Sequence, residues 1–225
     1  MMVLRKFFLI LVCFLFLLSC GQNTKNVKNE NTQADSIPQE RRIFALGDSL
    51  TAGYGLELED AYPAQLESKL TAAWYRYKVV NAGVSGNTSA ELLARIEWTL
   101  TDANPEDIVI LVIGGNDGLR GLPISDLKKN ILSMIEIIQA KELTLVLAGM
   151  QIPPNLGLAY ARDFKNVYSE IVAEVSDIYF LEFFLEDVAA VRKYNLPDMI
   201  HPNREGYQVI VENVFEFLVD NTIVW

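Results

Sequence analysis

The chain has 225 residues, of which 51% are hydrophobic, and its formal net charge at pH 7 is −10. This length and apolar content suit one domain with a sizeable core. The acidic excess disfavours binding to nucleic acid and electrostatic attachment to anionic lipid, because both carry negative charge.

The N-terminal stretch has the features of a bacterial lipoprotein signal. Two basic residues precede an apolar run over residues 7–18, which is too short for a comfortable membrane span. Ser19 then precedes Cys20, and this pattern resembles a lipobox, in which Cys20 becomes the lipidated first residue of the mature chain. We predict a signal peptide over residues 1–19. An ordinary signal peptide with a chance cysteine and an uncleaved anchor are the alternatives.

The folded part of the chain is expected to contain no thiol. Cys13 is the only other cysteine and lies inside the predicted signal peptide, which excludes cysteine nucleophiles, cysteine zinc sites and disulfides from the domain. Residues 20–40 are polar and Asn-rich, so we predict a lipidated Cys20 followed by a flexible tether. Membrane association would come from this lipid, placing the protein at the bacterial cell envelope, facing the periplasm or the cell surface.

Residues 41–225 form the predicted domain, in which strands alternate with helices. Predicted strands cover residues 42–46, 77–84, 107–115, 143–150 and 178–184, and predicted helices cover 60–74, 88–100, 125–140, 161–177 and 203–221. We expect Thr88 or Ser89 to cap the second helix and Ser125 the third. Alternation of this kind predicts a mainly parallel, five-stranded sheet with helices on both faces, an α/β fold.

Glycine-rich segments follow four of these strands, at residues 47–55, 81–89, 114–121 and 149–157. Ligands of open α/β sheets bind outside the carboxyl ends of the strands. Glycines gather in loops in any case. Their concentration after successive strands nevertheless makes this edge of the sheet the candidate site.

Ser49 stands at that edge, and a serine nucleophile needs a base and a group that orients the base. His201 is the chain's single histidine and lies between Pro197 and Pro202, which stiffen the loop. Asp198, three residues earlier, can reach Nδ1–H of His201 in a tight turn and fix its tautomer. A structural histidine and a turn-capping aspartate are the plainer alternatives.

Donors for a developing oxyanion are also available. The backbone N–H of Ser49 qualifies if a helix begins there, Gly86 lets the backbone approach an acyl oxygen closely, and Asn116 ends the most buried strand. Taken singly, Gly86 and Asn116 are each better explained by turn formation.

Together these segments resemble the GDSL, or SGNH, hydrolase family over nearly all of residues 42–219. Four blocks occur in order: "FALGDSLTAGYG", "VNAGVSGNTSAELLARI", "VILVIGGNDGLRGLP" and "DMIHPNREGY". The resemblance implies a flavodoxin-like three-layer α/β/α fold and no cofactor. It also implies roles for five residues: Ser49 as nucleophile with Asp198 and His201, and Gly86 and Asn116 as oxyanion donors beside the Ser49 N–H.

Two stretches, "GGNDGLRG" and "MQIPPNLG", resemble the bacterial periplasmic arylesterase and acyl-thioesterase branch, whose members also act as lysophospholipases. This resemblance implies a serine esterase acting on acyl esters, thioesters or lysophospholipids, without a metal. Apolar residues at the edge are candidates to cradle an acyl chain, namely Leu119, Leu122, Ile152 and Pro153. Nothing in the sequence demands more than a monomer.

Three other functions stay open. The segment after the first strand could imitate a phosphate-binding loop of a flavin-binding module. The chain could also be an envelope lipoprotein that binds a ligand without turnover. A metal hydrolase using Asp48, Asp117 and His201 is the third. The G-x-S-x-G elbow of ordinary α/β-hydrolases is absent, although the Ser–Asp–His order is compatible with them.

Overall fold

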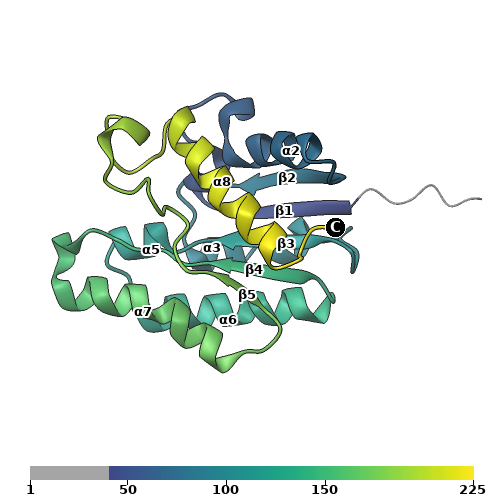
Figure 1. Cartoon of the computed structure of the whole chain (residues 1–225). Helices are drawn as coiled ribbons and strands as arrows, with labels where there is room; N and C mark the ends of the chain where they lie inside the picture. The colour runs from purple at the N-terminus through teal and green to yellow at the C-terminus, as the bar shows by residue number, and fades with distance from the viewer. Residues whose placement is uncertain (1–40) are drawn as a thin grey trace, which may run out of the picture. The chain divides into compact units, whose positions relative to one another are not determined.

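Five strands form one sheet in the computed structural model, which describes residues 41–225 (Figure 1). The strands are β1 (Arg41–Gly47), β2 (Tyr77–Gly83), β3 (Ile108–Val112), β4 (Thr144–Ala148) and β5 (Tyr179–Leu181). Every neighbouring pair is parallel, in the order β2-β1-β3-β4-β5. This is the flavodoxin-like order, so the predicted fold class is confirmed. The predicted signal peptide, Cys20 and the tether lie outside the described residues.

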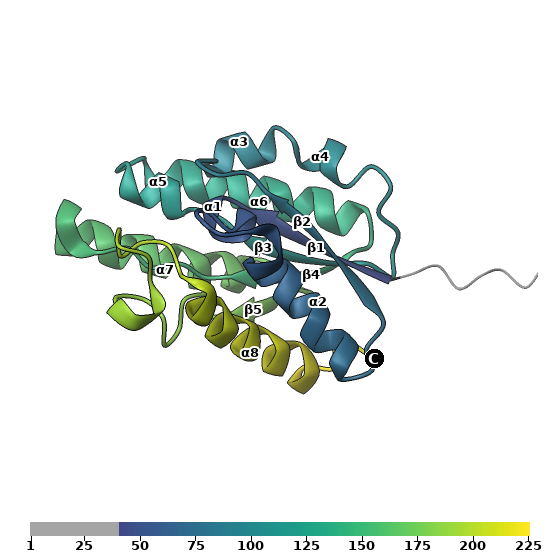
Figure 2. The same cartoon turned by 90° about the horizontal axis from the view of Figure 1, so that it is seen from above.

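The central strands are buried on both faces, as their unbroken apolar sequence predicts. Every residue of β3 is buried, and so are residues 43–47 of β1 and 145–148 of β4. Helices supply the cover. On one face α2 (Tyr62–Ala72) packs against α8 (Arg204–Asp220), and on the other α6 (Ile124–Ala140) contacts both α3 (Ser89–Leu93) and α7 (Leu158–Glu174) (Figure 2).

Six short elements complete the fold. They are α1 (Ser49–Ala52), α4 (Ile96–Thr99), α5 (Gly115–Leu119), and the 3₁₀ turns η1 (Leu58–Asp60), η2 (Pro154–Leu156) and η3 (Arg192–Tyr194). Among residues 41–225, no helix is both long and apolar enough to cross a membrane.

The predicted helix over 88–100 is wrong in one respect, because it is two helices, α3 and α4, separated at Arg95. The Arg95 guanidinium reaches back to the sheet and donates to the carbonyls of Gly47 (3.0 Å) and Ala82 (2.9 Å). Its backbone N–H bonds to the Leu92 carbonyl, three residues back, so the α-helical pattern breaks there. The break lets one cation bind the ends of two strands.

Several boundaries also differ from the prediction, among them those of α7, which covers residues 158–174 and not 161–177. Thr88 caps α3 and forms a capping box with Glu91, but Ser125 does not cap α6, which begins at Ile124 directly after Pro123. The last predicted strand shrinks to three residues, because the chain leaves the ladder after Leu181.

At the amino-terminal edge of the sheet, one buried carboxylate joins β1 to the start of β3. Asp107 is fully buried and accepts hydrogen bonds from the Arg42 backbone N–H (2.9 Å) and guanidinium (2.7 Å and 3.2 Å). The backbone and side-chain amides of Asn104 add two more, each at 3.0 Å. Arg42 also reaches Asp102, which lies at the surface.

Candidate active site

The chain passes from β1 into α1 through a turn that only glycine permits. A Cβ built on Gly47 would lie 2.1 Å from the Thr51 hydroxyl and 2.5 Å from the Val112 carbonyl. Asp48 then caps α1, with its Oδ1 accepting from the Leu50 N–H at 3.0 Å. Ser49 is therefore the first residue of a helix at the carboxyl end of β1, which meets the condition set above for its N–H.

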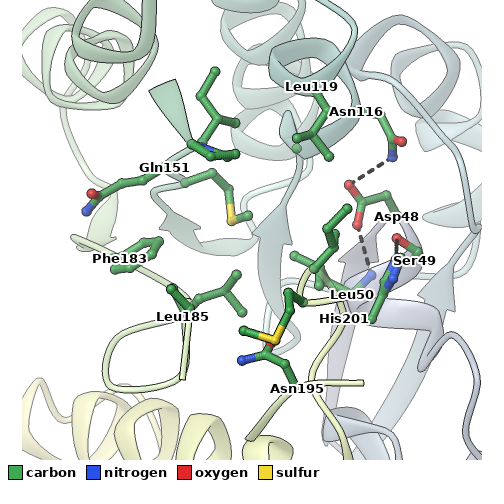
Figure 3. Close-up of a pocket in the computed structure, with 18 residues that line it drawn as sticks. Asp48, Ser49, Leu50, Asn116, Leu119, Gln151, Phe183, Leu185, Asn195 and His201 are labelled. Carbon is green, nitrogen blue, oxygen red and sulfur yellow. Dashed lines mark hydrogen bonds between the residues drawn. The ribbon is translucent and has the colours of Figure 1, made fainter. Parts of the chain in front are cut away.

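His201 lies within hydrogen-bonding distance of two side chains, that of Asp198 in its own turn and that of Ser49 in a distant segment of the sequence. Nε2 of His201 lies 2.9 Å from Oγ of Ser49, and Nδ1 lies 2.7 Å from Oδ2 of Asp198. Figure 3 shows the Ser49–His201 contact. Burial acts to raise the pKa of Asp198, but hydrogen bonds from His201 and from the Ile200 N–H lower it to about 2. The carboxylate beside the imidazole is therefore ionised at neutral pH.

A tight turn and one aromatic ring orient His201. Oδ1 of Asp198 accepts from the backbone N–H groups of Ile200 (2.9 Å) and His201 (3.0 Å), so Asp198 holds both the ring and the backbone of the histidine. The Tyr54 ring, which is half exposed, lies 4.5 Å from the imidazole, centre to centre. Asn203 caps α8 immediately afterwards.

The two predicted oxyanion donors outside α1, Gly86 and Asn116, come from the segments that follow β2 and β3, on either side of β1. Gly86 follows β2 and has φ +86°, a conformation that suits glycine. Asn116 belongs to α5, after β3, and its Nδ2 donates to Asp48 Oδ2 (3.3 Å) and to the Asn87 carbonyl (3.0 Å). The loops that carry these residues are thus held against each other beside the serine.

Asp48 is a buried acid next to these groups, with only 2% of its surface exposed. Burial raises its pKa to about 6, although the Leu50 N–H, the charge of His201 and the Asn116 amide act to lower it. From the sequence, Asp48 is predicted only as a possible metal ligand. Its burial depends on contacts that no local pattern displays.

An apolar pocket of about 510 Å³ opens beside Ser49 and His201. Of the residues predicted to cradle an acyl chain, Leu119, Ile152 and Pro153 line it, but Leu122 does not. The carbonyl of Leu122 instead accepts from the Tyr160 hydroxyl at 2.7 Å.

Much of the pocket wall was missed by sequence reasoning. These residues come mainly from the segments after β4 and β5: Met150, Gln151, Phe183, Leu185, Ala189, Ala190, Asn195, Met199 and Ile200. In Figure 3, Phe183 and Gln151 lie across the pocket from Ser49 and His201. The rule that sites lie at the carboxyl ends of strands applies to β5 too, but its loop lacks glycine and was passed over.

The three side chains of the predicted metal alternative do not converge. Within residues 41–225, no group of three His, Cys, Asp or Glu side chains is arranged to hold a metal ion. The Asp117 carboxylate instead accepts hydrogen bonds from the hydroxyl (2.6 Å) and the backbone N–H (2.8 Å) of Ser89.

Comparison with known proteins gives one consistent result. Residues 45–209 match the GDSL-like lipase/acylhydrolase family. The chain is 37% identical to "Esterase TesA" of Pseudomonas aeruginosa over 176 residues, which is 78% of this chain and 87% of the relative. It is 34% identical to "Thioesterase 1/protease 1/lysophospholipase L1" of Escherichia coli K12, covering 76% of this chain and 79% of the relative.

A solved structure agrees with these relatives. The psychrotrophic esterase EstA from a Pseudoalteromonas species, inhibited by monoethylphosphonate, superposes with a TM-score of 0.75 at 29% identity. The match covers 80% of this chain and 97% of that one.

Proposed function

Because the chain belongs to the GDSL-like lipase/acylhydrolase family, we propose that it is a serine esterase that hydrolyses acyl esters, thioesters and lysophospholipids through an acyl-enzyme. One observation carries this proposal: the 2.9 Å contact between Ser49 Oγ and His201 Nε2 at the edge of an apolar pocket. A nucleophile, its base and a place for an acyl chain are thereby side by side.

In the first step, Ser49 Oγ attacks the carbonyl carbon while Nε2 of His201 takes the hydroxyl proton. Asp198 holds the imidazole by Nδ1 and stabilises the imidazolium that forms. The tetrahedral intermediate collapses as His201 gives its proton to the leaving oxygen or sulfur. Water, deprotonated by the same imidazole, then attacks the acyl-enzyme and releases the carboxylic acid.

The negative oxygen of the intermediate needs donors already in place. We assign this role to the N–H groups of Ser49 and Gly86 and to the amide of Asn116, whose Nδ2 exchanges its long 3.3 Å contact with Asp48 for the oxyanion. The first is at the start of α1, and the other two flank it. Loss of one such donor typically raises the barrier by about 3–4 kcal/mol.

The acyl chain has an apolar surface to bind. Leu119, Ile152 and Pro153 line the pocket together with Phe183. Each methylene group buried there contributes about 0.8 kcal/mol. A flavin or a ligand bound without turnover would leave the contact between His201 and Ser49 without a purpose.

Replacing the proposed nucleophile tests this function. Ser49→Ala is expected to reduce hydrolysis of a chromogenic short-chain ester by roughly 10⁴-fold or more, because no acyl-enzyme forms. The wild-type protein should also react with a fluorophosphonate probe, whereas Ser49→Ala should not. Circular dichroism of both proteins controls for folding. Full activity of Ser49→Ala in a folded protein would remove the serine from its role.

We also propose that the enzyme is a monomer held at the bacterial envelope by lipid on Cys20. The support is the sequence alone, because Cys20 lies outside the described residues. A full-length Cys20→Ser chain should move from the membrane fraction to the soluble fraction and lose metabolic labelling by palmitate. Unchanged membrane fractionation would contradict the lipid attachment.

A further inference from the structure

Arg120 contacts both residues that the proposed function assigns as oxyanion donors from outside α1. It caps the carboxyl end of α5, one turn after Asn116. Its Nη2 donates to the Gly86 carbonyl at 2.9 Å and lies 3.4 Å from the Asn116 Oδ1. One nitrogen atom therefore bridges the loop after β2 and the helix after β3.

The chemistry of these contacts fixes which way the Asn116 amide faces. A guanidinium only donates, so Arg120 binds Oδ1, while the Asp48 carboxylate only accepts and so binds Nδ2, at 3.3 Å. A flipped amide would lose both contacts and oppose donor to donor. Arg120 and Asp48 thus hold Nδ2 on the side of the Asp48–Ser49 turn.

The Gly86 peptide is held from the same direction. Arg120 binds the Gly86 carbonyl, and the Asn116 amide binds the carbonyl of the next residue, Asn87, at 3.0 Å. Two hydrogen bonds from α5 therefore hold consecutive carbonyls of this loop. Gly86 has φ +86°, and glycine has the most flexible backbone of all residues. Without these hydrogen bonds, the Gly86 peptide would therefore be weakly restrained.

We propose that Arg120 is a positioning residue of the oxyanion site, which sets the orientation of the Asn116 amide and of the Gly86 peptide. This inference rests on the proposed function. Arg120 does not line the pocket and is exposed to solvent, so it acts through the two donors and not on the substrate. Its effect belongs to the transition state, because the donors matter most when the oxyanion forms.

The test compares Arg120→Met, which keeps the apolar stem, with Arg120→Lys and with a control, Arg162→Met. Among residues 41–225, the Arg162 guanidinium contacts only its neighbour Asp163. For Arg120→Met we expect kcat to fall by roughly 10- to 100-fold, with KM changed by less than about threefold. The urea midpoint should stay near that of the wild-type protein. Arg162→Met should match the wild type in all three measurements.

Two rescues separate positioning from a general structural role. A lysine ammonium also donates in several directions, so Arg120→Lys should recover part of the lost kcat. Millimolar guanidinium chloride should likewise raise the kcat of Arg120→Met and leave Arg162→Met unchanged. A merely structural defect would respond to neither.

Failure of this inference is distinguishable from failure of the proposed function. An unchanged kcat in Arg120→Met, alongside an inactive Ser49→Ala, would overturn the role of Arg120 and leave the esterase intact. A loss of kcat accompanied by lost stability, with no rescue by lysine or guanidinium, would also overturn it. Activity in Ser49→Ala would instead overturn the proposed function, and the Arg120 role with it.

Discussion

Two buried aspartates at opposite edges of the sheet have very different hydrogen-bond partners. Asp107, at the amino-terminal edge, accepts three hydrogen bonds from Arg42 and two from Asn104. Asp48, at the carboxyl edge, accepts from the Leu50 N–H and, at 3.3 Å, from the Asn116 amide. Within residues 41–225, no cation forms an ion pair with Asp48.

The difference shows at which edge of the sheet this protein keeps an unfavourable buried charge. A buried carboxylate is costly unless it is paired and hydrogen-bonded. At the amino-terminal edge Arg42 supplies that pairing, and the result joins two strands. At the carboxyl edge the burial of Asp48 is only partly offset, and its pKa rises to about 6. This partly compensated acid lies beside Ser49, in the part of the sheet where the chemistry is proposed.

The largest expected effect comes from breaking the compensated pair. Asp107→Ala removes the buried partner of the Arg42 guanidinium, which keeps only its contacts with Asp102, and the acceptor of two backbone N–H groups. Removal of one member of a buried ion pair typically destabilises a protein by about 3–5 kcal/mol. Because Arg42 retains some solvent contact, we expect the lower end of that range. Urea unfolding at pH 7 measures the change, and activity per folded molecule should be unaffected.

Asp102→Asn is the matched control, because Asp102 binds the same guanidinium from the solvent side, with 76% of its side chain exposed. An exposed ion pair contributes little, so the loss should be under about 1 kcal/mol. Equal losses from the two substitutions would mean that burial does not distinguish these carboxylates.

A smaller, pH-dependent effect is expected at the carboxyl edge. The pKa of Asp48 is raised in the folded state, from 3.8 to about 6, so folding favours its protonated form. As pH rises from about 4 to about 6, ionisation of Asp48 therefore removes stability from the wild-type protein. Asp48→Asn has no such titration. Its stability relative to the wild type should increase over this interval by up to about 3 kcal/mol, since a tenfold change in proton affinity is about 1.4 kcal/mol.

Urea unfolding of both proteins at several pH values from 4 to 8 tests this. Asp198 has a lowered pKa, so its own contribution is lost only as the pH falls below about 4, outside the range compared. A difference between the two proteins that stays constant from pH 4 to 8 would show that Asp48 is not an undercompensated acid.

Some of the fold and of the site was predictable because the signals are local. The apolar run of β3 predicts a strand that is buried on both faces, and the alternation of strands with helices predicts the parallel sheet. Ser49 and His201 were identifiable because one follows a strand end and the other is the chain's single histidine. The spacing of Asp198 from His201 fits a tight turn, and the 2.7 Å contact lies within that turn.

Other features depend on distant partners and left no such signal. The helix breaks at Arg95, whose guanidinium binds carbonyls at the ends of β1 and β2, far from it in the sequence. Leu122 resembled Leu119 as an apolar loop residue, yet only Leu119 lines the pocket. Ser125 has the right chemistry for a cap, but the helix begins one residue earlier.

By itself, the sequence determined the family, the parallel α/β fold and the three residues that form the Ser49–His201–Asp198 array, because periodicity, composition and short motifs are read along the chain. Tertiary structure alone decided which apolar side chains enclose the pocket, how deeply Asp48 is buried, and that Arg120 meets both Gly86 and Asn116. Burial and hydrogen-bond geometry are set by groups that approach one another only when the strands pair and the loops converge.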